Sequence, residues 1–190
     1  YLEGYHKPAA TDVDQPVYDA IDDILTNGRT SRLFRSLVRD KQIAVSVGAY
    51  AAYPGDKYPH VWLAYGVPGR GVSNQTVQQA LREEFEKLKT QDVSDEELAR
   101  FRTRAKAGLI RALNNNLGLA MHITDYHMLF GDWRELFRYI KRFDLVTKED
   151  IRRVAQEMFQ PTNRIVGMIE TVPPPSMAVP ASAAIGEGQS

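Results

Sequence analysis

The four histidines are the first residues to consider, because imidazole is the commonest protein ligand for a metal ion. His122 and His127 are five residues apart, which on a helix separates them by about 140°, whereas metal-binding pairs on a helix are usually four residues apart. His6 and His60 stand alone near the ends of expected strands. Neither His-x-x-Glu-His nor its reverse occurs. We therefore expect no metal site made by this chain alone.

Positive charge is concentrated between Asn27 and Val47, in the segment "NGRTSRLFRSLVRDKQIAVSV". Its arginines could bind an anion, a nucleic acid or a substrate, or form the wet side of a helix. The helical pattern places Leu33, Phe34, Leu37 and Val38 on one apolar stripe and Arg32, Arg35 and Arg39 on the opposite side. Lysine plus arginine (24) equals aspartate plus glutamate (24) over the whole chain. This balance favours a solvated helix face over a nucleic-acid partner.

Other catalytic patterns are missing or incomplete in the sequence. No serine lies in a Gly-x-Ser-x-Gly setting. The glycines at 66, 69 and 71 lie between a strand and a helix, but the third glycine of a dinucleotide fingerprint is absent. The acid pairs Asp22-Asp23 and Glu83-Glu84 fall in amphipathic helices, where we expect them on solvent faces. The residues by themselves therefore predict no catalytic site.

The elements that would position these residues form an α+β pattern. Strands are expected over 1–6, 43–53, 58–67 and 163–169, and helices over 14–26, 31–40, 73–89, 94–114, 117–130, 133–143 and 147–159. This order predicts helices layered on one face of a mainly antiparallel sheet. Residues 1–171 are expected to form a single domain, and the Pro/Ala/Ser/Gly-rich residues 172–190 a tail or linker. No run is long and apolar enough for a membrane span, so no membrane partner is expected.

The ordered set of segments resembles a known enzyme family. "GRTSRLFRSLVRDKQIAVSV" is similar to the Gly-x-x-Ser-Arg-Leu…Leu-Arg-Glu-Lys-x-x-Leu-Ala-Tyr-x-Val segment of the pitrilysin/insulinase family of zinc metallopeptidases, which includes the mitochondrial processing peptidases. "VSDEELARFRTRAKAGLIRALNN", "GLAMHITDYHMLFGDW" and "FDLVTKEDIRRVAQEMFQPTNRIVGMI" resemble its closing helices and final strand. The similarity extends over nearly all of 1–170.

This resemblance implies a role as one half of a clamshell. In the family, two homologous α+β halves enclose a chamber; the first carries the inverted zinc motif and a glutamate base, and the second usually lacks the metal ligands. The chain resembles the second, non-catalytic half. The resemblance implies a homologous N-terminal catalytic half as partner, in the same chain or a separate subunit, zinc on that partner, and a peptide substrate. The chain alone is expected to be inactive.

The family's second half commonly lends the active site an Arg and a Tyr, seven residues apart. These positions fall on Val38 and Val45, which are the substrate-facing candidates that the resemblance implies. Neither valine can donate a hydrogen bond, so an oxyanion-type role does not carry over. Arg39 is a possible neighbouring contact, one position later. Two readings stay open: the substrate-enclosing half of an active zinc endopeptidase, or a structural and assembly domain of a catalytically degenerate member.

Overall fold

The sheet has four antiparallel strands. The computed structural model describes residues 1–170 of the 190-residue chain, so the expected tail at 172–190 lies outside the described residues. The strands are β1 (Leu2–Lys7), β2 (Ala44–Tyr53), β3 (His60–Pro68) and β4 (Arg164–Gly167), in the order β2-β3-β1-β4. All three neighbouring pairs are antiparallel. The expected α+β class is confirmed.

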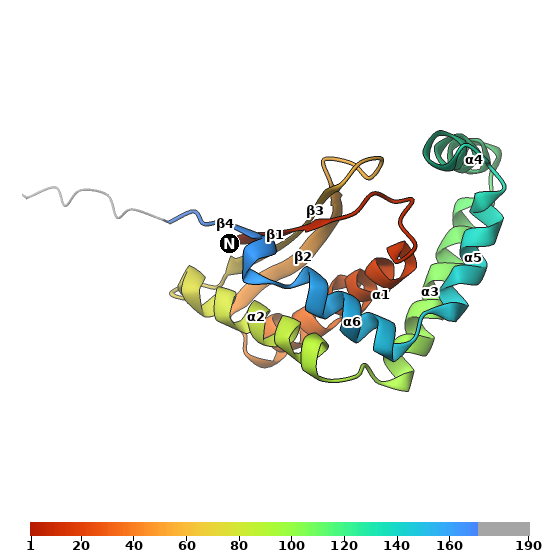
Figure 1. Cartoon of the computed structure of the whole chain (residues 1–190). Coiled ribbons are helices and arrows are strands. Elements are labelled where there is room, and N and C mark those ends of the chain that lie inside the picture. Colours follow the sequence, from red (N-terminus) through yellow and green to blue (C-terminus); the bar gives the residue numbers. More distant parts are fainter. Residues whose placement is uncertain (171–190) are drawn as a thin grey trace, which may run out of the picture.

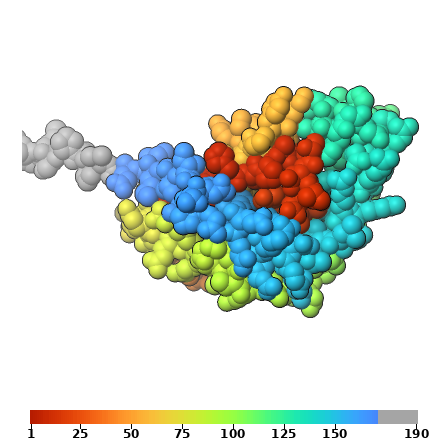
Figure 2. Space-filling view, in the orientation of Figure 1, coloured from red at the N-terminus to blue at the C-terminus, as the bar shows by residue number. Residues whose placement is uncertain are grey.

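The helices divide into a layer and a lobe. The elements are α1 (Gln15–Thr26), η1 (Phe34–Asp40), α2 (Asn74–Thr90), α3 (Asp95–Ala112), α4 (Asn116–Phe130), α5 (Glu135–Leu145), α6 (Lys148–Met158) and the short turn η2 (Pro161–Asn163). Helices α1, α2 and α6 run along one face of the sheet (Figure 1). Helices α3, α4 and α5, here called the helical lobe, extend from that layer; α4 and α5 form one end of the molecule (Figure 2). Among residues 1–170, no helix has both the length and the apolar character needed to cross a bilayer.

An aromatic cluster joins the sheet to the helix layer. Tyr5 of β1 contacts Phe85 of α2 and Phe159 after α6, with ring centroids 5.9 and 5.0 Å apart. The rings of Phe85 and Phe159 stack at 4.5 Å, and Trp62 of β3 packs against both. All four side chains are buried. Their burial, together with edge-to-face ring contacts, holds together β1, β3, α2 and the end of α6, which are distant in sequence.

A buried carboxylate connects β1 to α2. The side chain of Glu3 is completely buried and accepts hydrogen bonds from the hydroxyls of Tyr1 and Tyr5. Arg82 of α2 donates from Nε to the same carboxylate at 3.2 Å. Burial and the neighbouring Glu3 raise the pKa of Tyr1 to about 12, so this hydroxyl stays protonated and remains a donor. The acidic side chain of Glu3 deep in the fold is therefore held by two hydroxyls and a guanidinium, as a buried polar group requires.

The sequence interpretation of Arg32 as part of a solvated face is wrong. Arg32 Nε and Nη2 each lie 2.8 Å from a carboxylate oxygen of Glu97, and the side chains are only 13% and 11% exposed. Glu97 also accepts from the backbone N–H of Ser94, whose hydroxyl caps α3. Burial alone would raise the pKa of Glu97, but the hydrogen bonds from Arg32 and Ser94 outweigh it and lower the pKa to about 2. The Glu97 carboxylate thus stabilises the first turn of α3 and also holds Arg32, in the segment before η1, in place.

We predict that Glu97→Gln lowers the free energy of unfolding by about 1–2 kcal/mol at pH 7, because it leaves Arg32 without a charged partner. The folded-state pKa lies below its ordinary value of 4.5, so the stabilisation is complete above pH 4.5 and disappears as the pH falls toward 2. Urea unfolding of both proteins at several pH values measures this.

Glu83→Gln is the matched control for this experiment. Glu83 pairs with Lys41, but both side chains are more than 40% exposed, so the loss should stay below about 0.5 kcal/mol. Equal decreases in the free energy of unfolding of the two variants would show that the Arg32–Glu97 pair stabilises the fold no more than an exposed ion pair does.

Candidate substrate-facing site

The segment that carries Val38 is a π-helix. In η1 the backbone N–H of Lys41 donates to the carbonyl of Ser36, five residues earlier, at 3.0 Å. This differs from the expected α-helical geometry; π-helical turns are rare and occur often at functional sites. Leu37 is fully buried, and Val38 is half-buried and packs against the same core. Val38 is therefore only partly accessible.

Val45 lies in an irregular stretch of β2. Ala44 pairs with Pro68 and Ser46 with Val67, so the register shifts at Val45. Such a bulge redirects a side chain relative to a regular strand. The Val45 side chain is 65% exposed. Of the two positions that the resemblance singles out, Val45 is thus the more accessible, and both lie where the backbone departs from regular structure.

The cations around η1 are neutralised by acidic partners. Arg39 pairs with Asp40, and Lys41 with Glu83. Arg39 is the first cause of the lowered pKa of Asp40. A shallow pocket of about 400 Å³ lies beside these residues; its lining includes Arg35, Arg39 and Lys87. Lys87 is paired with Glu84 at 2.7 Å. Four cations of this segment, Arg32, Arg35, Arg39 and Lys41, are therefore taken up in ion pairs.

The sheet face opposite the helix layer is apolar and uncovered within the described residues. No helix of residues 1–170 lies across it in Figure 1. Its side chains alternate with those that face the core, and the register groups them across neighbouring strands. We call this surface the open face; His6 and Ser46 are its polar members, and its apolar members are Leu2, Tyr50, Val61, Leu63, Tyr65, Val67 and Ile165. Leu2, Tyr50, Val67 and Ile165 are each more than a third exposed.

Two glycines allow the open face to be flat. A Cβ atom on Gly48 would lie 2.8 Å from the Tyr65 hydroxyl oxygen and 3.0 Å from its ring. A Cβ on Gly4 would lie 2.8 Å from a methyl carbon of Val61. The Tyr65 ring therefore occupies the space that a side chain at 48 would take, 5.8 Å from the ring of Tyr50. The open face therefore has few projecting side chains around these two glycines.

A partly buried polar cluster lies on the other side of the sheet and was missed by sequence reasoning. Asp22, expected on a solvent face, instead accepts from the indole N–H of Trp62 at 2.8 Å, and Asp19 accepts from the hydroxyl of Tyr139 at 2.8 Å. Burial raises the pKa of both aspartates and lowers that of Lys7. Glu84 is also buried, contrary to expectation. The apolar residues of α1 predicted its inner side but gave no signal for these polar contacts.

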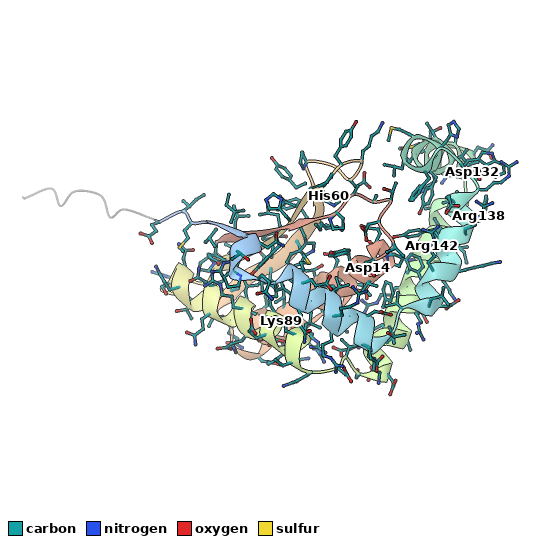
Figure 3. The ribbon with its side chains drawn as sticks, viewed as in Figure 1. Asp14, His60, Lys89, Asp132, Arg138 and Arg142 are labelled. Atoms are coloured by element: carbon teal, nitrogen blue, oxygen red, sulfur yellow. The ribbon has the colours of Figure 1, made fainter. Side chains whose placement is uncertain are left out.

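The histidines do not come together in the structure. His60 is buried at the start of β3 (Figure 3), with Nδ1 3.0 Å from the carbonyl oxygen of Tyr58. Within residues 1–170, no group of three or more His, Asp or Glu side chains lies close enough together to hold a metal ion.

Comparison with known proteins places the chain in a family. A family model described as the inactive domain of M16 peptidases matches residues 2–105. The Zinc protease PqqE of Helicobacter pylori (strain ATCC 700392 / 26695) is 29% identical over 159 residues, a match that covers 84% of this chain and 35% of that protein. The chain thus spans about a third of the curated relative that it matches.

Solved structures agree with this match. A protease from Helicobacter pylori has a TM-score of 0.78 and 26% identity, covering 86% of this chain and 39% of that one. A protein of Bordetella pertussis Tohama I, named a candidate zinc protease, has a TM-score of 0.76 and 25% identity, covering 90% of this chain and 93% of that one. Because the family match covers more than half of the sequence, this chain belongs to the family of inactive domains of M16 peptidases.

Proposed function

We propose that this chain is the substrate-enclosing, non-catalytic half of a zinc-dependent endopeptidase. Its zinc motif would lie on a homologous N-terminal half, either preceding this one in the same chain or on a separate subunit. Residues 1–171 would act as one α+β domain. The observation that carries the proposal is the open face, an apolar sheet surface that no described helix covers.

The chemistry of the open face supports contact with a peptide. Antiparallel sheets commonly present polar side chains on the face they leave to water, whereas this face presents Tyr50, Val67 and Ile165. Contiguous exposed apolar surface marks places where another molecule is bound. The flat area around Gly48 and Tyr65 can lie against an extended peptide of varied sequence, because it offers apolar contact without deep side-chain pockets.

The division of labour between the halves follows from the residues present. Zinc on the partner half would polarise the scissile carbonyl and activate a water molecule. This chain would confine the peptide and exclude bulk water, which strengthens electrostatic interactions in the chamber. Val38 and Val45 cannot donate a hydrogen bond to a developing oxyanion. The enclosing half would therefore contribute shape and burial, with charge stabilisation left to its partner.

A second function is favoured by those same two valines. A structural or assembly domain of a degenerate family member would keep the open face as a contact surface and need no donor at positions 38 and 45. The two functions differ in what accompanies this chain. A partner half with His-x-x-Glu-His and a downstream Glu supports the peptidase, and a partner half without them supports the scaffold.

We expect the chain alone to bind no stoichiometric zinc and to cleave no peptide. Its described residues bring together no set of metal ligands, and tight zinc binding needs three or four. Elemental analysis after equilibration with zinc and gel filtration, with a fluorogenic peptide assay on the same sample, tests both expectations. One zinc retained per chain would contradict the assignment of the metal to the partner half.

Restoring the hydrogen-bond donor should raise activity in the intact two-half protein. Val45→Tyr, alone and combined with Val38→Arg, is expected to increase kcat/KM for peptide cleavage about ten-fold or more, because a phenol placed there can stabilise negative charge on the scissile oxygen. Val45 is exposed, so the single variant should fold normally. The half-buried Val38 calls for a thermal melt of the double variant.

Val13→Tyr serves as the control for that experiment, because Val13 is highly exposed in the loop before α1 and lies outside the open face and η1. A gain specific to Val45→Tyr supports the peptidase. Folded variants with no gain would favour the scaffold function.

A further inference from the structure

Helix α4 is apolar but has no buried residue. It contacts α3 and α5 on one side, where the Tyr126 ring lies 5.9 Å from that of Tyr139. Its other side presents Leu117, Met121 and Met128, which are 71, 57 and 54% exposed. A helix that is hydrophobic on all sides is normally covered on all sides. The uncovered side therefore has the character of a contact surface.

The exposed large apolar residues of α4 lie in a single row along the helix, beside the exposed Asp125 and His127. Leu117, Met121, Thr124 and Met128, here called the α4 stripe, follow one another at intervals of four, three and four residues. This average spacing of three and a half is the one with which two helices pack side by side. The intervals read the same in both directions. A second α4 laid antiparallel would place Leu117 opposite Met128 of the second copy, and Met121 opposite its Thr124.

The charges around α4 are compatible with this pairing. Along α5, Arg138 is held by Asp132 and Glu135, and Arg142 by Glu135 (Figure 3). These cations are therefore already engaged within the helical lobe. The stripe itself carries no formal charge, and Asp125 is the exposed acid next to it.

The antiparallel register also gives Asp125 a suitable environment. It brings this carboxylate beside Gly118 of the second copy, in the first turn of that copy's α4. The N-terminal turn of a helix carries partial positive charge from its free N–H groups. The exposed acid beside the seam would thus meet a complementary charge, and the interface is self-complementary about a two-fold axis.

We propose that two copies of this chain associate through the α4 stripe, antiparallel, about a two-fold axis near residues 122 and 123. The helix has 15 residues and is about 22 Å long. One helix pair of this length lies at the small end of specific interfaces, so the dimer should be weak and concentration-dependent. The inference concerns an outer surface away from the open face and does not depend on the proposed function.

Sedimentation equilibrium of the 190-residue chain over rising concentration tests the association. We expect a monomer–dimer equilibrium that Met121→Glu weakens at least about ten-fold, since it places a charge in the middle of an apolar seam. Val13→Glu, which adds the same charge at a highly exposed loop position, should leave the equilibrium unchanged. Thermal melts establish that both variants fold. A wild-type chain that stays monomeric throughout, or equal effects of the two variants, would overturn the proposal.

Disulfide trapping tests the register, because the chain contains no cysteine. Single variants Leu117→Cys and Met128→Cys should form a mixed disulfide when oxidised together, and neither should link to itself. In the antiparallel pair, identical positions are offset by 11 residues, or about 16 Å along the helix, beyond the reach of a disulfide. Efficient self-linking of either variant, without the mixed product, would contradict the antiparallel seam.

Discussion

Within residues 1–170, helices cover the sheet on one face only, and much of the architecture follows from that asymmetry. Tyr5 and Trp62 point into the helix layer and contact Phe85 and Phe159, so a large part of the favourable burial lies between the strands and α1, α2 and α6. The other face keeps its apolar side chains although no described helix shields them. In the proposed function, the side chains that stabilise the fold and those that contact a substrate lie on opposite sides of the same strands, so changes on the open face need not disturb the core.

The arginines before and within η1 are held in ion pairs with acidic side chains. The arginines before and within η1 look like an anion-binding cluster in the sequence, but Arg32 is fixed by Glu97 and Arg39 by Asp40. Glu97 has two tasks, since it closes the capping box of α3 and receives Arg32. The same carboxylate therefore connects the start of the helical lobe to the segment that leads into η1, next to Val38. Positioning of that segment depends on an ion pair with little exposure to water.

The sequence predicted the elements well where local chemistry determines them. Ser73, Ser94 and Thr147 each accept a hydrogen bond at the start of a helix, and each is the first residue of a helix range expected from the sequence. Contacts between distant residues could not be read in this way. The residues of the Arg32–Glu97 pair are 65 positions apart in the sequence. The hydrogen bond from Trp62 to Asp22 joins β3 to the face of α1 that the amphipathic pattern alone predicts to be exposed to solvent.

The position of the candidate site stays a prediction, and its backbone geometry could not be predicted from the sequence. The family resemblance pointed to Val38 and Val45, yet the π-helical turn around one and the bulge at the other have no clear sequence signal, because both depend on how η1 and β2 fit against the core.

The bareness of the open face also has a thermodynamic consequence. Water against apolar side chains such as Tyr50 and Ile165 is released when another surface lies on them, and burial of apolar area gives association a negative heat-capacity change. Contacts made there weaken on cooling more than contacts made by ion pairs such as Arg32–Glu97. The two faces of the sheet thus differ in how the strength of their contacts depends on temperature. A molecule bound to the open face is held less tightly as the temperature falls.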